Sequence, residues 1–113
     1  MTIVTGLGSW PGVDVVEAVD QTREAFPVSP FLPELPARGL GSDMVGRTLG
    51  LIEDLAFEPS VTGWATAAHT SRAQRAARAA ARDDLDIAAD LFQDHAGPFH
   101  VTLAGPWTLA ALV

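Results

Sequence analysis

The sequence predicts an α/β fold in which short strands and helices alternate along the chain. Apolar residues make up 48% of the 113 residues and charged residues 19%, which is typical of a globular protein. Short β-branched or apolar runs alternate with stretches whose apolar residues recur at helical spacing. Because the strands are separated by helices, the pattern favours a parallel sheet.

The first strand and the first helix are expected within residues 2–26. Residues 2–5, TIVT, are β-branched and end at Gly6, which is typical of a short buried strand. A helix begins after Asp14, whose carboxylate can cap the first turn, and it ends at Pro27. Its apolar face is formed by Val15, Val19, Thr22 and Phe26.

The second strand and helix follow the same pattern. Residues 31–35, FLPEL, are expected to form a strand that Pro33 weakens. Ser42 can cap the next helix, and Pro59 closes this unit. The apolar stripe of that helix is formed by Val45, Leu49, Ile52 and Leu55.

Two more strands complete a βαβαβαβ order. Residues 60–67, SVTGWATA, are expected to form the third strand, and Ser71 then caps a long helix of about 25 residues. The fourth strand is expected at residues 99–104, FHVTLA, and residues 105–113 begin another helix. This last segment is apolar and has no polar exit. We therefore expect residues 1–113 to be the N-terminal part of a single larger α/β domain, and to self-associate when alone.

Charge and composition exclude several classes of function. The net charge is -7, with seven arginines and no lysine, which disfavours binding to nucleic acid. The chain has no cysteine, so it holds neither disulfides nor thiolate metal sites. It has no apolar run of about 18 residues and no secretory signal, so we expect a cytoplasmic protein without a membrane partner.

Polar residues follow the predicted strands, and the carboxyl ends of parallel strands meet at one mouth. The turn from Gly6 through Leu7 and Gly8 to Ser9 exposes backbone N–H groups that can hold a carboxylate or a phosphate. Pro11 replaces the third glycine of a dinucleotide-binding motif, which excludes that motif. A tight turn without a ligand is the alternative interpretation.

Three further groups have a functional and a structural interpretation. Glu34 could bind an ammonium group or transfer a proton, or it could be a solvated loop carboxylate. Arg38 could pair with a substrate carboxylate or with Asp43. The histidines lack metal-binding spacing, so we assign no metal to them. They are His69, His95 and His100.

The long helix carries a stripe of arginines followed by aspartates, which is typical of a solvated face with salt bridges such as Arg82–Asp86. Nucleic-acid binding is the minor alternative for this stripe. Arg72 differs because it stands at the start of the helix, near the end of the third predicted strand.

Four segments, in order, resemble motifs of the catalytic domain of cobalamin-independent methionine synthase. They are LGSWP, ELPARGLGSDMV, GWATAAHTSR and VTLAGPWTLAAL. The resemblance covers nearly the whole chain and extends to the short, single-barrel actinobacterial type of this family. It implies the N-terminal half of a (β/α)8 barrel. It also implies transfer of a methyl group from methyltetrahydrofolate, or from another donor such as a methylated corrinoid protein, to the thiol of homocysteine.

The resemblance also implies roles for individual residues. Leu7, Gly8 and Ser9 match the turn that holds the homocysteine carboxylate, Glu34 matches the acid that binds its amino group, and Arg72 matches the segment that touches the folate. The family's zinc ion favours the homocysteine thiolate. Its ligands are a His, a Glu and two Cys on later strands, and they have no counterparts in residues 1–113.

The folate half of the match is weaker than the acceptor half. The family's folate-stacking tryptophan aligns with Leu112, and Trp107 lies on a different helical face. Two other functions stay open. One is a decarboxylase of the uroporphyrinogen type, which shares the fold, needs no metal and would use Arg38 and Arg72 to grip substrate carboxylates. The other is a barrel that binds a small molecule without catalysis.

Overall fold

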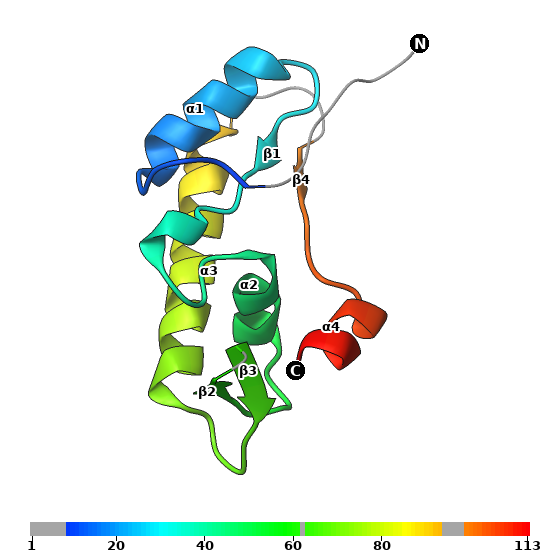
Figure 1. Cartoon of the computed structure of the whole chain (residues 1–113). Helices are drawn as coiled ribbons and strands as arrows, with labels where there is room; N and C mark the ends of the chain where they lie inside the picture. Colours follow the sequence, from blue (N-terminus) through cyan, green and yellow to red (C-terminus); the bar gives the residue numbers. More distant parts are fainter. Residues whose placement is uncertain (1–8, 62, 94–98) are drawn as a thin grey trace.

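The structure is a computed structural model that describes residues 9–61, 63–93 and 99–113 (Figure 1). The described residues form an α/β arrangement of helices and short strands, so the predicted class is confirmed. The elements are α1 (Val15–Ala25), β1 (Phe31–Leu32), the 3-10 turn η1 (Pro36–Arg38), α2 (Met44–Leu51), β2 (Phe57–Ser60), β3 (Gly63–Thr66), α3 (Arg72–Leu91), β4 (His100–Val101) and α4 (Pro106–Leu112).

Helices α1, α2 and α3 begin at side-chain caps, two of which were predicted. Asp14 caps α1 and Ser71 caps α3, and in both helices the side-chain oxygen accepts a backbone N–H from the first turn. The predicted cap of α2, Ser42, is wrong by one residue. Asp43 caps this helix because its carboxylate accepts the backbone N–H of Gly46 at 2.7 Å.

The described strands form two separate two-stranded sheets, and the parallel one is short. β1 pairs in parallel with β4, with Phe31 opposite His100 and Leu32 opposite Val101. A single parallel bridge joins Ser9 to Glu34, two residues beyond β1. The strand predicted at residues 2–5 lies outside the described residues.

The third predicted strand is wrong, because residues 57–66 form an antiparallel hairpin instead of one parallel strand. The register places Phe57 opposite Thr66 and Ser60 opposite Gly63. Gly63 has φ +128°, a conformation that side chains disfavour, and this lets the chain reverse direction in the middle of the predicted strand.

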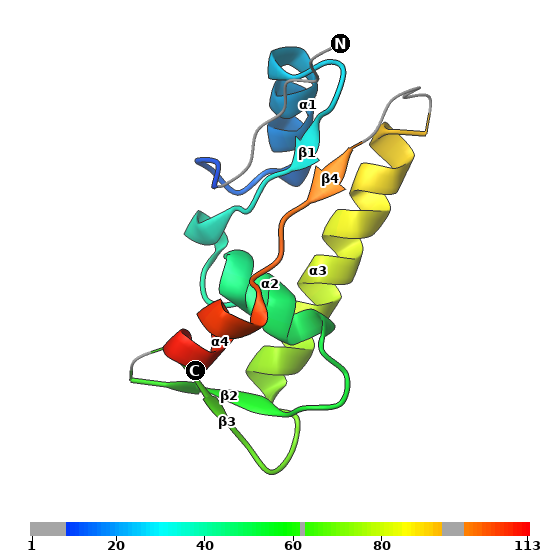
Figure 2. The ribbon, with the colours of Figure 1, turned by 90° about the vertical axis from the view of Figure 1, so that its right-hand side faces the viewer.

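Two apolar clusters form the core, and α3 runs past both of them (Figure 2). The first lies between α1, β1 and α3 and contains Val19, Leu32, Ala88 and Phe92. The second lies between α2 and the hairpin and contains Leu49, Phe57 and Trp64. Close packing of α2 on α3 depends on Gly50, because an added Cβ there would lie 2.8 Å from the backbone of Ala77.

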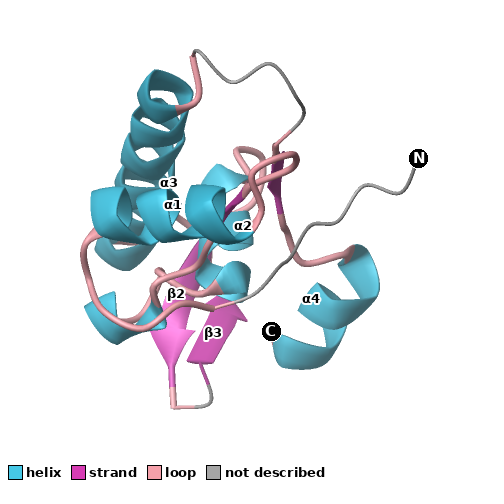
Figure 3. Cartoon of the chain, turned by 90° about the horizontal axis from the view of Figure 1, so that it is seen from above, coloured by secondary structure: helices cyan, strands magenta, loops and turns pink. Residues whose placement is uncertain are grey.

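The outer helix α4 is the least buried element. It has no buried residue, although Leu109 packs against the second cluster. Seen from above, α1 and α3 lie on one side of the molecule and α4 on the other (Figure 3). Within the described ranges, no helix combines the length and the apolar character needed to cross a bilayer.

Candidate functional site

Ser9 and Glu34, two of the residues singled out in the sequence, lie side by side. The Ser9 hydroxyl donates a hydrogen bond of 3.2 Å to Oε2 of Glu34. The backbone N–H of Trp10 donates to the Glu34 carbonyl at 2.8 Å, which continues the parallel bridge. The structure therefore joins the segment after the first predicted strand to the end of the second.

Glu34 is 4% exposed, so it is not a solvated loop carboxylate. Its burial follows from its neighbours, because Leu32 and Leu35 are both fully buried and Pro33 lies between them within the core. A carboxylate in such surroundings is unfavourable unless nearby groups compensate for the lost hydration. The groups that face it are therefore part of the site.

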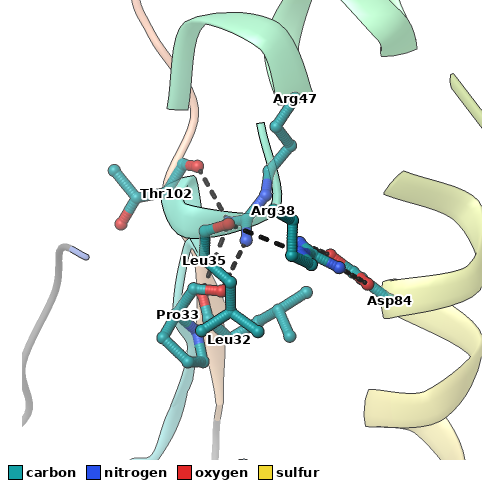
Figure 4. Close-up of polar contacts among 7 residues, drawn as sticks. All are labelled: Leu32, Pro33, Leu35, Arg38, Arg47, Asp84 and Thr102. Carbon is teal, nitrogen blue, oxygen red and sulfur yellow. Dashed lines mark hydrogen bonds and ion pairs between the residues drawn. The ribbon is translucent and has the colours of Figure 1, made fainter. Parts of the chain in front are cut away.

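Arg47, which the sequence analysis did not identify, is a buried cation next to this strand end. It is 4% exposed, and its guanidinium donates to the carbonyls of Leu32 at 3.3 Å, Pro33 at 2.8 Å and Thr102 at 3.5 Å (Figure 4). Burial lowers the pKa of Arg47, while the carboxylates of Glu34 and Asp84 act in the opposite direction. The signal in the sequence was the position of Arg47 between Gly46 and Gly50, because glycines let neighbouring segments pack closely against this helix.

Arg38 is held by α3 and not by the partner that we predicted. Its two terminal nitrogens bind the two carboxylate oxygens of Asp84 at 2.9 and 2.8 Å (Figure 4). Asp43, the predicted partner, is engaged as the cap of α2. The bidentate pair fixes η1 against α3 and occupies the guanidinium fork.

Arg72 lies apart from Ser9 and Glu34. It is exposed in the first turn of α3 and lines an open hollow of about 620 Å³, together with Leu40, Glu58 and Pro59. Neither Ser9 nor Glu34 lines this hollow. The structure therefore joins Ser9 and Glu34, both assigned to the amino-acid acceptor, and leaves Arg72, assigned to folate, elsewhere.

Two further arginines of α3, Arg78 and Arg82, contact the end of α2 and the residues just after it, while Arg75 donates to the Thr70 carbonyl before α3. Arg78 donates to the carbonyls of Gly50 at 2.8 Å and Ile52 at 3.0 Å. Arg82 pairs with Glu53 at 3.3 Å, and not with Asp86 as expected. Because the carbonyl end of a helix carries partial negative charge, the Arg78 guanidinium stabilises α2.

The remaining predicted positions are Leu7, Gly8 and the three histidines. Leu7, Gly8 and His95 lie outside the described residues. His69 is exposed, and His100 stacks on Phe31 with ring centroids 5.8 Å apart. No group of three or more His, Asp or Glu side chains within the described part of the chain is arranged to hold a metal. These residues do not fit a zinc site, so no chemical step is assigned to zinc here.

The site thus consists of a hydroxyl and a carboxylate on two segments joined by a parallel bridge, with a buried guanidinium close by. A carboxylate that already accepts one hydrogen bond retains further acceptor sites for an ammonium group. Such a charge-assisted bond is strong where water is largely excluded. No family model, curated protein or solved structure matches the chain.

Proposed function

We propose that this chain is the N-terminal part of a cytoplasmic (β/α)8-barrel methyltransferase that acts on the thiol of homocysteine. The methyl donor is methyltetrahydrofolate or another methylated carrier. The observation that carries the proposal is the contact between Ser9 and the buried Glu34, two of the four positions assigned to the acceptor amino acid. The reaction itself is inferred from the four sequence segments that resemble the methionine synthase family.

The site chemistry is suited to an amino acid. Glu34 would accept the ammonium group through a charge-assisted hydrogen bond, and Ser9 would orient the Glu34 carboxylate through the 3.2 Å contact. The substrate carboxylate would bind at the backbone N–H groups of residues 7–9. These contacts bind and orient the acceptor and do not by themselves transfer the methyl group.

The order of the parallel segments supports the part of the proposal that concerns the barrel fold. The bridge from Ser9 to Glu34 and the pairing of β1 with β4 form three parallel segments in chain order. Helices lie between them, as in a barrel. Because β2 and β3 pair only with each other among the described residues, β4 would take the third place in the barrel, and the hairpin would be an insertion between the second and third strands.

Titration of the full chain with L-homocysteine, by calorimetry, tests the proposal. Glu34→Gln should weaken binding about tenfold or more, because the neutral amide loses the ion pair with the ammonium group. Glu58→Gln is the matched control, since Glu58 is exposed on β2. Equal affinity of the Glu34→Gln variant and the unchanged protein would contradict the proposal.

The two other functions are less well supported. A decarboxylase of the uroporphyrinogen type would need Arg38 for a substrate carboxylate, but Asp84 already binds both of its terminal nitrogens. A barrel that only binds a small molecule would share the Ser9–Glu34 contact. An assay of methyl transfer to homocysteine distinguishes this last function from the proposed one.

A further inference from the structure

Arg47 takes the place of sheet hydrogen bonds where the parallel ladder stops. β1 and β4 are paired over only two residues each, and Pro33 has no N–H with which to continue the ladder. The carbonyls of Leu32, Pro33 and Thr102 all bind the Arg47 guanidinium instead. A single side chain from α2 therefore links the exits of both strands.

The next residue of α2 makes a second connection to β4. Thr48 Oγ1 accepts the backbone N–H of Ala104 at 2.8 Å and donates to the Met44 carbonyl at 2.8 Å. Both Arg47 and Thr48 are buried. Two consecutive residues of one helix thus determine where the segments after β1 and β4 leave the sheet.

Charge connects this arrangement to Glu34. The Glu34 and Asp84 carboxylates are the anionic groups that act on Arg47, and Arg38 is the neighbouring cation. Among the described residues, Arg47 and Glu34 do not approach within ion-pair distance. The guanidinium therefore compensates for the buried negative charge without occupying the carboxylate.

We propose that Arg47 is a positioning residue for Glu34, holding the Leu32–Pro33 backbone so that the next residue presents its carboxylate to the acceptor ammonium group. The part of this inference that concerns the ligand rests on the proposed function. The part that concerns the backbone does not, because it follows from the three carbonyl contacts alone. Each part has its own measurement.

The variant Arg47→Lys keeps the charge but removes the fork that spans both strands. Arg78→Lys is the matched control, since Arg78 also donates to two backbone carbonyls but at the end of α2. In the full chain, we expect Arg47→Lys to weaken L-homocysteine binding about tenfold and Arg78→Lys by less than about twofold. Comparable loss of affinity in the two variants, or none in Arg47→Lys, would overturn the inference.

Amide hydrogen exchange tests the backbone part without any ligand. Arg47→Lys should accelerate exchange of the Trp10 amide, which donates to the Glu34 carbonyl, and Arg78→Lys should not. Unchanged Trp10 exchange in folded Arg47→Lys refutes the positioning role. If the unchanged protein binds no homocysteine, the proposed function fails while the exchange result still decides the role of Arg47.

A measurement on the unchanged protein applies even if Arg47→Lys does not fold. Because Arg47 links both strand exits, saturation with L-homocysteine should slow exchange of the Trp10 and Ala104 amides together. Slower exchange at Trp10 alone would show that the two exits are not coupled through α2, and would overturn the inference.

Discussion

The strand-end region and the hairpin region of this molecule are anchored by different chemistry. Around Glu34, charged groups hold the backbone: Arg47 binds three carbonyls, and Arg38 pairs with Asp84. Around the hairpin, a neutral side chain binds the backbone groups instead. Gln74, fully buried in α3, accepts the N–H of Phe57 and donates to two carbonyls after and within α2.

This difference indicates which region is built for a ligand. A buried amide satisfies backbone groups without an unpaired charge, so it stabilises the fold at little electrostatic cost. A buried guanidinium is unfavourable unless anions lie near it, and its positive charge produces a local electrostatic field. The region with charged anchors is also the one that holds the buried carboxylate of Glu34. Four variants test this comparison, in order of expected effect.

The largest effect is expected from Gln74→Ala in the hairpin region. This change leaves the buried Phe57 N–H and the carbonyls of Leu49 and Leu55 without their partner. We expect the free energy of unfolding, measured by urea denaturation, to fall by about 3–5 kcal/mol. Gln93→Ala is the exposed control. A loss below about 1 kcal/mol would show that the hairpin does not depend on this neutral anchor.

Asp84→Asn tests the charged anchor. The amide side chain would retain one acceptor oxygen, so the bidentate pair with Arg38 would be lost. We expect a loss of about 2 kcal/mol in unfolding free energy, together with weaker L-homocysteine binding, because η1 directly follows the Glu34 segment. Asp86→Asn, on the exposed face of α3, should change neither. Weaker L-homocysteine binding in Gln74→Ala but not in Asp84→Asn would contradict the inference that the strand-end region, and not the hairpin region, is built for a ligand.

Gly63→Ala measures how far the hairpin depends on backbone conformation. At φ +128° an alanine is strained, although nothing lies within 4 Å of the added Cβ. We expect destabilisation by about 1–2 kcal/mol in thermal unfolding. Gly105→Ala is the control because its Cβ also meets open space, at φ -78°. Equal effects of the two changes would show that the turn does not require the positive φ.

The smallest effect is expected from Thr48→Val at the exit of β4. The valine preserves the shape of the side chain but leaves the buried Ala104 N–H without an acceptor. We expect a loss of about 1 kcal/mol and faster amide exchange at Ala104. Thr48→Ser keeps the hydroxyl and should restore slow exchange. If Thr48→Ser exchanges as fast as Thr48→Val, the hydroxyl is not what holds this strand exit.

The sequence by itself determined where α1 and α3 begin, whereas α2 ends at Leu51, before the Ile52 and Leu55 that were expected in its apolar stripe. Helical periodicity and the caps at Asp14 and Ser71 are local signals, because each joins residues within one turn of the chain. The α/β class followed from the same signals. That Ser9 and Glu34 lie close together was also accessible from the sequence, since both follow segments read as parallel strands whose ends meet at one mouth.

Only the tertiary structure decided which strands pair and which charges meet. Residues 60–67 have a strand-like composition, but the turn at Gly63 and the anchor at Gln74 make them half of a hairpin. Arg38 binds a residue 46 positions away, and Arg47 becomes buried because two strand exits converge on it. These contacts join segments far apart in the chain, where periodicity and spacing carry no information, and they determine the environment of Glu34.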